Sequence, residues 1–312
     1  MNKNILLSIG ITILFLGMSI TPSVAVDTVK KRSMPISNGK TLYVGGTGEG
    51  NYTRIQGAIN HASVGDTVFV YDDSAPYREN IVVERTISLI GENRDTTVID
   101  GGGYKNVIYI LRADCDWVTV SGFTIQNSDT GIFIYYHSEH NNITGNIISN
   151  NVNGILLSLS GYNTIEDNII SNNGKGINLY GSSSSYNTIT GNTISNNLIG
   201  IHLRGSSHNI IKGNNIISNS RYGIRLVPDT SSEPFVYPSF SVRNTILKNN
   251  FLDNKQHASF VYFLGSLNRW SQNYWNRPRI LPKIIIGVNW FLPWINIDWF
   301  PALKPYDIEG VI

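Results

Sequence analysis

Cysteine and charge are both scarce in this sequence. The 312 residues include one cysteine, Cys115, which excludes an internal disulfide framework and a cysteine-rich metal site. A single cysteine most often behaves as a small buried hydrophobe. Charged residues make up only 15% of the chain, with a net charge of +2. This composition argues against a polyanion-binding protein, and against nucleic acid as a partner, because phosphate contacts need a concentrated basic surface.

Ligand sets and catalytic motifs are also missing. The six histidines are dispersed, and the single cysteine and three methionines form no cluster of soft copper ligands with them. The alternating aspartates of a calcium loop are absent. Neither the G-x-S-x-G motif of serine hydrolases nor a phosphate-binding loop occurs. The sequence therefore predicts no metal site and no cofactor.

Asparagine and glycine, by contrast, recur at a fixed period between Asn141 and Leu226. The segments "NNITGNIISNNVNGILL", "NTIEDNIISNNGKGINL", "NTITGNTISNNLIGIHL" and "NIIKGNNIISNSRYGIRL" repeat one pattern. A period of this length is the signature of a stacked solenoid. Each copy holds short β-type runs separated by Asn and Gly, which predicts an all-β parallel β-helix with one coil per copy. The glycines that mark the period are 22 to 24 residues apart, at Gly131, Gly154, Gly176, Gly200 and Gly223.

Aliphatic and variable residues alternate after each of these glycines. Period-2 alternation places the aliphatic residues inside the coil and the variable residues outside. Equivalent residues of successive coils should form columns, because stacked coils repeat at about 4.8 Å. One inner column is aliphatic, and another, at a corner, is a ladder of hydrogen-bonded amides. The predicted members are Ile132, Ile155, Ile177, Ile201 and Ile224, and Asn150, Asn172, Asn196 and Asn219.

The N-terminal residues 1–25 have the features of an export signal. Lys3 supplies a positive start, Ile5 to Ile20 an apolar run, and Ser23-Val24-Ala25 a small-residue cleavage site. An uncleaved membrane anchor is the alternative. In either case the body of the protein is expected outside the cytoplasm, in the extracellular space or the cell envelope. Residues 26–40 are expected to form a linker, 41–268 the β-helix and 269–312 a C-terminal cap.

Both ends of the solenoid should be covered, because an open coil exposes strand edges and core. Apolar residues at helical spacing between Ile55 and Ala62 predict a short capping helix. Residues 269–312 contain five of the six tryptophans, which favours an aromatic cap, with a sugar-stacking platform as the alternative. The period is interrupted once, by the long loop Val227 to Phe240, after which the alignment places Ala258 at the glycine position.

The coils resemble the parallel β-helix repeats of the NosD-type family, named after a periplasmic protein of copper-enzyme maturation. The segments "GDTVFVYDD" and "ENIVVERTISLIGENRDTTVIDGG" are similar to the first coils of such proteins, and "NYWNRP" and "DWFPALKPYD" to the closing segment of secreted archaeal members. The resemblance covers about residues 41–312. It implies a right-handed single-stranded parallel β-helix, a pectin-lyase-like solenoid, in a group of carbohydrate-binding and sugar-hydrolase proteins. A structural envelope protein or a NosD-like metal-related accessory protein are further alternatives.

The outward columns on the strand after each glycine are the candidate binding surface. Two positions after the glycine the residues are Phe133, Leu156, Asn178, His202, Arg225 and Phe260, and four positions after it they are Tyr135, Ser158, Tyr180, Arg204, Val227 and Tyr262. Such side chains can stack on sugar rings and hydrogen-bond to hydroxyls or uronate carboxylates. An ordinary solvated sheet face is the alternative. With a polysaccharide or surface glycan as the partner, the predicted ligand-binding residues are Tyr135, Asn178, Tyr180, His202, Arg204 and Arg225.

A carbohydrate-active enzyme, either a glycoside hydrolase or a polysaccharide lyase, is the alternative function. Glycoside hydrolysis generally needs two carboxylates about 5–9 Å apart, and neither outward column contains Asp or Glu. The best catalytic candidates are Asp129, His137 and Glu139, which could join Asp114 and Asp116 from the preceding coil. Solvated turn residues are the other interpretation of this group.

Overall fold

The computed structural model describes residues 39–103, 105–111, 115–230, 239–262, 267–289 and 292–308. The predicted export signal, most of the predicted linker, Asp114 and the centre of the Val227 to Phe240 loop lie outside these residues. The chain divides into two units, Met1–Pro35 and Ile36–Ile312, and every described residue belongs to the second. The described residues contain no helix with the length and apolar character that a membrane span requires.

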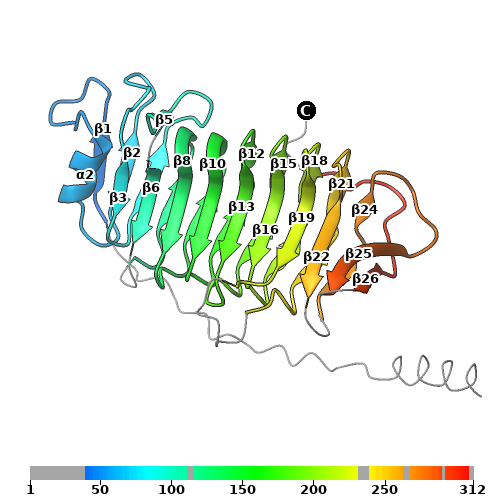
Figure 1. Cartoon of the computed structure of the whole chain (residues 1–312). Coiled ribbons are helices and arrows are strands. Elements are labelled where there is room, and N and C mark those ends of the chain that lie inside the picture. The colour runs from blue at the N-terminus through cyan, green and yellow to red at the C-terminus, as the bar shows by residue number, and fades with distance from the viewer. Residues whose placement is uncertain are drawn as a thin grey trace, which may run out of the picture. The chain divides into compact units, whose positions relative to one another are not determined.

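The second unit is a parallel β-helix whose coils stack into three sheets, which confirms the predicted all-β fold (Figure 1). Sheet A contains β1 (Thr41–Val44), β2 (Thr67–Val70), β4 (Ser88–Gly91), β7 (Thr119–Ser121), β9 (Asn142–Thr144), β11 (Thr164–Glu166), β14 (Thr188–Thr190), β17 (Ile210–Lys212), β20 (Thr245–Leu247), β23 (Arg269–Ser271) and β26 (Leu292–Asp298). Sheet B contains β5 (Val98–Asp100), β8 (Thr124–Tyr135), β10 (Ile147–Ser158), β12 (Ile169–Ser171), β15 (Thr193–Ser195), β18 (Asn215–Ile217), β21 (Asn250–Leu252) and β24 (Tyr274–Trp275). Sheet C contains β3 (Ile81–Val83), β6 (Asn106–Leu111), the second halves of β8 and β10, β13 (Lys175–Tyr180), β16 (Ile199–Arg204), β19 (Tyr222–Val227), β22 (Ala258–Tyr262) and β25 (Lys283–Asn289).

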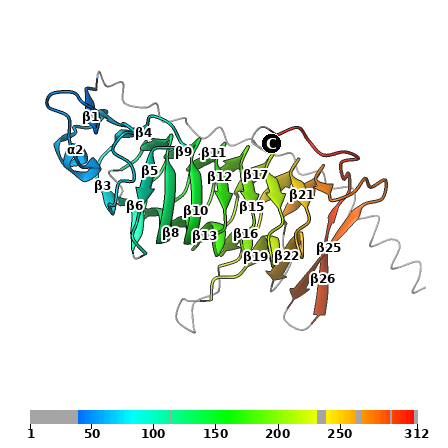
Figure 2. The same cartoon turned by 90° about the horizontal axis from the view of Figure 1, so that it is seen from above.

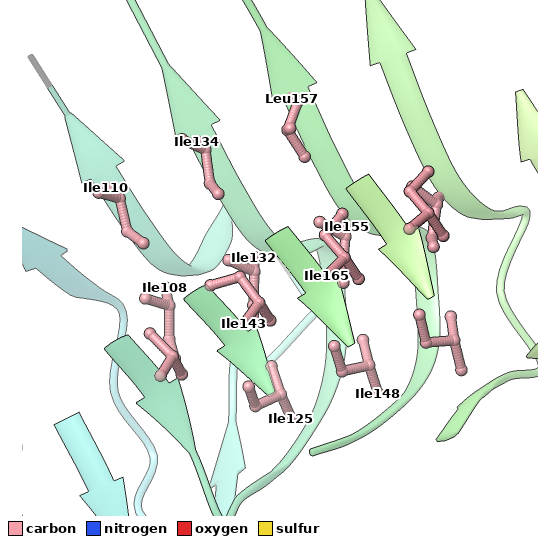
Figure 3. Close-up of a cluster of buried hydrophobic side chains, with 14 of the residues drawn as sticks. Ile108, Ile110, Ile125, Ile132, Ile134, Ile143, Ile148, Ile155, Leu157 and Ile165 are labelled. Carbon is pink, nitrogen blue, oxygen red and sulfur yellow. The ribbon is translucent and has the colours of Figure 1, made fainter. Parts of the chain in front are cut away.

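The core is built from aliphatic columns that run across the coils (Figure 3). The predicted isoleucine column is confirmed: its five members are paired in register and have no exposed surface. A second column two residues later contains Ile134, Leu157 and Leu179, also fully buried. Because each side chain lies over its equivalent in the next coil, burial continues for as long as the sequence repeats.

Three buried asparagine ladders, one at each corner of the coil, hold the stack together. In each ladder an amide oxygen accepts hydrogen bonds from the backbone N–H and the side-chain Nδ2 of the asparagine one coil earlier, as between Asn168 and Asn192 at 3.0 Å for both bonds. The Nδ2 group of Asn168 also donates to the carbonyls of Ile143 and Glu166, both at 2.8 Å. The ladders are Asn141, Asn163, Asn187, Asn209, Asn244 and Asn268 at the C–A corner, Asn146, Asn168, Asn192, Asn214, Asn249 and Asn273 at the A–B corner, and Asn151, Asn173, Asn197, Asn219 and Asn254 at the B–C corner.

The predicted ladder is therefore wrong by one residue in three of its four members. Asn150, Asn172 and Asn196 are exposed and adopt left-handed backbone conformations, with φ of 58°, 58° and 56°. Only Asn219 belongs to the buried ladder. A left-handed residue turns the chain at the corner and interrupts the two-residue alternation, so the following asparagine faces inward instead.

The first coils are covered by helix α2 (Ile55–His61), as predicted. The carboxylate of Glu79 accepts hydrogen bonds from the backbone N–H groups of Ile55 at 2.9 Å and Gln56 at 3.1 Å, which satisfies donors at the start of the helix. The helix packs one apolar face on the core, with no more than 2% exposure for Ile55, Ala58, Ile59 and Ala62.

The last coil is covered by an antiparallel hairpin of β25 and β26 (Figure 2). Ile285 of β25 is buried, and Gly287 lies so close to the ring of Phe260 that a side chain there would collide with that ring. Asp298 ends the ladder at the A–B corner by accepting hydrogen bonds from both the N–H and the Nδ2 of Asn273, at 2.9 and 3.0 Å. A carboxylate suits this last position because it needs only to accept.

The alignment after the long loop differs from the prediction by one residue. Strands β19 and β22 pair Ile224 with Ala258, so His257 takes the place equivalent to Gly223, where Ala258 was expected. The cause lies in the coil before the loop. Asn219 precedes Gly223 by four residues, one more than the ladder asparagines of earlier coils precede their glycines. The ladder asparagines of the next coil follow 35 residues later, so counting 35 residues from Gly223 ends one residue too far along β22.

Candidate functional site

The outer face of sheet C carries the two predicted columns. Strands β8, β10, β13, β16 and β19 lie side by side (Figure 1). Their register places successive members of each column directly opposite one another in a row. The first row contains Phe133, Leu156, Asn178, His202 and Arg225, and the second contains Tyr135, Ser158, Tyr180, Arg204 and Val227.

The last member predicted for the first row is wrong. Phe260 pairs with Leu226, faces the core and has no exposed surface. Ser259 is the residue that lies opposite Arg225. The one-residue shift described above accounts for the difference. The side chain of Tyr262 lies outside the described part of the chain.

A third outward row was missed because the predicted columns began after the glycine. It consists of the residue before each glycine, and its register is continuous with the other rows. The pattern was available in the sequence, since the residue before each repeat glycine is as variable as the outward residues after it. The members are Thr130, Asn153, Lys175, Ile199 and Tyr222.

The first coils of the face are aromatic. Tyr109 and Phe133 stack with ring centroids 5.1 Å apart and an interplanar angle of 12°. Tyr135 packs against both rings, at 6.4 and 5.3 Å. Burial raises the pKa of Tyr109 above its ordinary value. This part of the face therefore offers a flat, uncharged aromatic surface.

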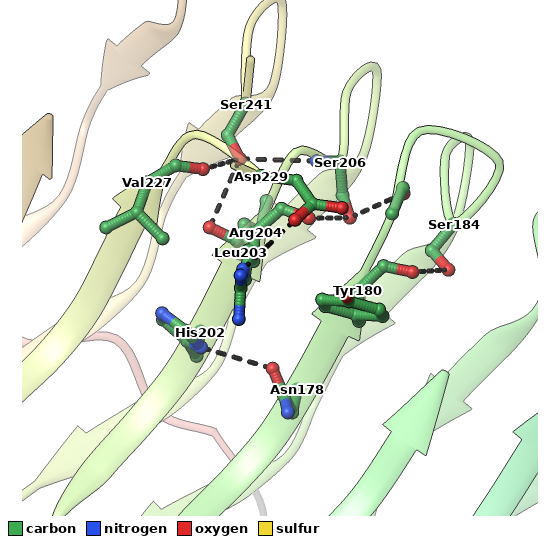
Figure 4. Close-up of polar contacts among 11 residues, drawn as sticks. Asn178, Tyr180, Ser184, His202, Leu203, Arg204, Ser206, Val227, Asp229 and Ser241 are labelled. Carbon is green, nitrogen blue, oxygen red and sulfur yellow. Dashed lines mark hydrogen bonds and ion pairs between the residues drawn. The ribbon is translucent and has the colours of Figure 1, made fainter. Parts of the chain in front are cut away.

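The later coils of the face carry a hydrogen-bonded polar row (Figure 4). The Nδ2 group of Asn178 donates to Asn153 Oδ1 at 3.1 Å, which directs its oxygen toward the ring of His202. His202 Nδ1 lies 3.1 Å from that oxygen. An amide oxygen can only accept, so neutral His202 carries its proton on Nδ1 and keeps Nε2 as an acceptor. His202 is only 8% exposed.

Positive charge surrounds this histidine. Burial, and then the charges of Lys175, Arg225 and Arg204, lower the pKa of His202 to about 3. Burial and the charge of Arg204 also lower the pKa of Lys175 from its ordinary value. The described residues provide no carboxylate partner for Lys175 or Arg225, and the buried Nε of Arg225 has no hydrogen-bond partner. The three cations and the neutral histidine form what we call the basic cluster.

Aromatic rings and one carboxylate border the basic cluster. Arg204 lies over the ring of Tyr180, 5.0 Å from its centroid, and pairs with Asp229 at 3.3 Å (Figure 4). Arg225 lies over the ring of Tyr222 at 4.8 Å. These cation–π contacts hold each guanidinium group beside a tyrosine ring. The structure thus brings together five of the six predicted ligand-binding residues, Asn178, Tyr180, His202, Arg204 and Arg225, whereas Tyr135 lies in the aromatic part.

The predicted catalytic residues are distributed along a strand. Asp129 is exposed in β8 where sheet B turns into sheet C, and Glu139 follows the end of that strand. The six residue-to-residue steps from Asp129 to Tyr135 alone span roughly 20 Å, so the two carboxylates lie at opposite edges of sheet C. His137 is exposed, with a φ of 58°. Glu139 instead lies beside Asp116, and the backbone N–H of Glu139 donates a hydrogen bond to Asp116 Oδ1 at 2.8 Å.

A stack of aromatic side chains follows the C–A corner on the outside of the coils. Neighbouring centroids are 4.5 to 5.6 Å apart, and each member has a left-handed φ between 57° and 65°. The residue before each of the first four C–A ladder asparagines supplies a ring, and Trp117 holds the equivalent place one coil earlier, a sequence signal that the predictions overlooked. Because each ring face covers the next, the stack offers edges rather than a platform to a sugar. The members are Trp117, His140, Tyr162, Tyr186 and His208.

Metal ligands do not converge within the part of the chain that the structure describes. No three His, Cys, Asp or Glu side chains there form a group that could hold a metal ion. His140 and His208 belong to the aromatic stack, and His202 lies among cations. Cys115 is buried, with its Sγ donating to the carbonyl of Leu111 at 3.0 Å.

Solved structures share this right-handed parallel β-helix fold. Pectate lyase Pel9A has a TM-score of 0.54 and 14% identity, over 78% of this chain and 71% of that one. The enzymatically active domain of bacteriophage CBA120 tailspike protein 2 has a TM-score of 0.52 and 14% identity, over 76% of this chain and 38% of that one. An alginate lyase from a Paenibacillus species has a TM-score of 0.49 and 15% identity, over 74% of this chain and 98% of that one. At these identities the similarity concerns the fold alone.

Sequence comparison adds the family. No curated protein shows significant sequence similarity to this chain. The family model described as periplasmic copper-binding protein (NosD) matches residues 59–290, which include the coils and the basic cluster. That match spans well over half of the sequence and agrees with the resemblance of the repeats. This chain belongs to the NosD family.

Proposed function

We propose that this protein is an exported β-helix that binds an acidic polysaccharide along the outer face of sheet C. The observation that carries the proposal is the basic cluster, in which Lys175, Arg204 and Arg225 surround a neutral histidine with one carboxylate, Asp229, among their described partners. Cations held in a half-buried setting without enough counter-charge favour an anionic ligand. A uronate carboxylate would supply that charge and could be held by the guanidinium group of Arg225.

The rest of the face suits the uncharged parts of a sugar chain. Tyr180 and Tyr222 lie beside the arginines, and Tyr109, Phe133 and Tyr135 extend an aromatic surface toward the first coils. A polysaccharide lying across the coils would meet a row of equivalent positions about every 4.8 Å. The net charge of +2 pointed away from a polyanion, but net charge does not report a local cluster. Export to the envelope is supported by the family description, which is periplasmic.

Copper does not enter the proposal. The family description names copper, whose usual protein ligands are His, Cys and Met. The three methionines are Met1, Met18 and Met34, all outside the described residues, and Cys115 is buried and hydrogen-bonded. The described histidines form no group with other ligands. These residues do not fit a copper site, and the proposed binding of polysaccharide does not use copper.

The test is to measure the affinity of the full chain for polygalacturonate and alginate, with neutral amylose for comparison. Arg225→Gln and Lys175→Gln should each weaken binding of the acidic polymers by about tenfold or more. Tyr180→Ala with Arg204→Ala should weaken it at least as much. Lys212→Gln removes an exposed lysine from sheet A and is the matched control. Equal affinity for amylose, or equal weakening by Lys212→Gln, would contradict the proposal.

A polysaccharide lyase is a second candidate, favoured by the fixed ring of His202. With its proton on Nδ1, Nε2 can accept the proton from C5 of a uronate while the electrons form a C4=C5 bond and the C4–O bond breaks. The leaving oxygen would take a proton from water or from the Tyr180 hydroxyl. The unsaturated product absorbs ultraviolet light. Formation of this product by the wild type and its loss with His202→Gln would support the lyase. Binding of the polysaccharide without any product would contradict the lyase and support a non-catalytic binding protein.

A further inference from the structure

The C-terminal hairpin carries an apolar face that points away from the coils. In β25, Ile285 and Gly287 face the last coil, and the alternate residues Ile284, Ile286 and Val288 are 52%, 61% and 50% exposed. Register places Ile297, Ile295 and Pro293 of β26 opposite these three. The outer face of a terminal cap is ordinarily polar because it meets solvent. Here both strands present aliphatic side chains instead.

More apolar side chains adjoin this hairpin in the sequence. Large exposed apolar patches on a protein mark interaction sites. Of the eleven exposed large hydrophobic residues between Leu267 and the end of the described chain, five lie in β25 and β26. These two strands form the hairpin at the end of the stack in Figure 2. The aromatic members are amphipathic or bulky types that favour a membrane–water interface. Besides the aliphatic residues of the hairpin, the exposed large hydrophobic residues of this region are Ile280 at 92% exposure, Leu281 at 75%, Trp294 at 46%, Trp299 at 57%, Phe300 at 73% and Leu303 at 60%.

The charges of this region are predominantly positive. Residues 277–308 contain Arg277, Arg279, Lys283 and Lys304. The acidic residues in this range are Asp298 and Asp307, and Asp298 is fully buried among hydrogen bonds. Lys283 lies on the coil side of β25, with its Nζ 5.8 Å from the centroid of the Trp275 ring, and burial and the charges of Arg279 and Arg277 lower its pKa from its ordinary value. A second copy of the chain would bring the same positive charges against these, whereas an anionic surface would attract them.

We propose that the apolar face of the β25–β26 hairpin docks on an anionic lipid bilayer, with its aliphatic side chains in the interfacial region. Apolar area and basic residues act together in such binding, since one supplies burial and the other attraction to anionic headgroups. The surface is separate from the basic cluster, and it would hold the solenoid at a membrane by its C-terminal end. Polysaccharide binding does not depend on it.

The test uses the full chain and vesicles of phosphatidylcholine and phosphatidylglycerol that contain brominated acyl chains. Residues 1–38 contain no tryptophan, so quenching of tryptophan fluorescence reports on the body of the protein even where the N-terminal apolar run inserts. Trp270 and Trp275 are buried, and Trp294 and Trp299 are exposed on the hairpin segment. Quenching is expected with the anionic vesicles, and it should decrease with salt and with the removal of phosphatidylglycerol.

Ile286→Asn with Ile295→Asn removes the centre of the face without touching the core and should weaken vesicle partitioning roughly tenfold or more. The control is Val152→Asn with Ile210→Asn, two residues that are 60% and 44% exposed on the coils, and it should leave partitioning unchanged. Sedimentation with vesicles but no quenching would overturn the proposal, as would equal loss in both double variants. A dimer in solution that Ile286→Asn abolishes, without quenching by vesicles, would assign the face to a second copy and also overturn it.

Discussion

The asparagine ladders and the outer rows of sheet C repeat with the same period but hold their residues in different ways. Each ladder keeps asparagine in five or six successive coils, whereas the first outer row changes from Phe133 through Asn178 to Arg225. A ladder position is sealed from water and needs one group that both donates and accepts. A side chain at an outer position faces solvent or a ligand. The backbone therefore fixes its location but does not restrict which residue type can stand there.

The largest effect is expected from breaking a ladder. Asn192→Ala removes an amide whose oxygen accepts two bonds from Asn168 and whose Nδ2 donates to Ile165, Thr190 and Asn214. Several buried groups lose their partners at once, so unfolding should become easier by about 3 kcal/mol or more. Thermal unfolding followed by circular dichroism measures the change.

Asn196→Ala is the matched control for this prediction. Asn196 stands four residues further on, but it is exposed and left-handed, and its replacement should cost only about 1 kcal/mol, from the strained backbone alone. If the two substitutions lowered the unfolding temperature equally, the distinction between ladder and corner residues would fail.

An intermediate effect is expected from the acid titration of His202, which belongs to the outer face yet is buried. Its pKa is about 3 in the fold and near 6.5 when unfolded, so the fold favours the neutral ring. The unfolded chain binds the extra proton between these values. The stabilising contribution is therefore complete above about pH 6.5 and is lost as the pH falls toward 3.

His202→Gln tests this prediction by comparison with the wild type. The variant should lose less stability than the wild type between about pH 7 and about pH 4, by on the order of 1 kcal/mol or more. Urea unfolding at each pH measures the difference, and the other histidines contribute equally to both proteins. Parallel curves for the two proteins would show that His202 does not titrate as described.

The smallest effect is expected at the carboxylates that the sequence singled out. Asp129→Ala and Glu139→Ala change residues at opposite edges of sheet C, outside both the ladders and the basic cluster. Binding of acidic polysaccharide should change by less than about twofold, and stability by less than about 0.5 kcal/mol. Affinity measurements on the two single variants are sufficient. A large loss with either variant would move the site toward the corners of the sheet.

The sequence by itself determined the period, the aliphatic core and the kind of fold. Ile132 and its equivalents could be placed inside because two-residue alternation holds within a strand. The helix over the first coils followed from apolar spacing for a similar reason. Two of the three outward rows of sheet C were also identified from β8 to β19, since they occupy the same strands as the isoleucines.

Only the tertiary structure decided the phase at the corners and the grouping of charges. A single left-handed residue such as Asn150 shifts inward and outward positions by one, and one extra residue before Gly223 displaced the predicted alignment of β22 by one residue. Asp129 and Glu139 are near in sequence, but an extended strand separates them across sheet C. Lys175 and Arg225 are 50 residues apart in sequence, and stacking of coils brings both to the same face beside His202.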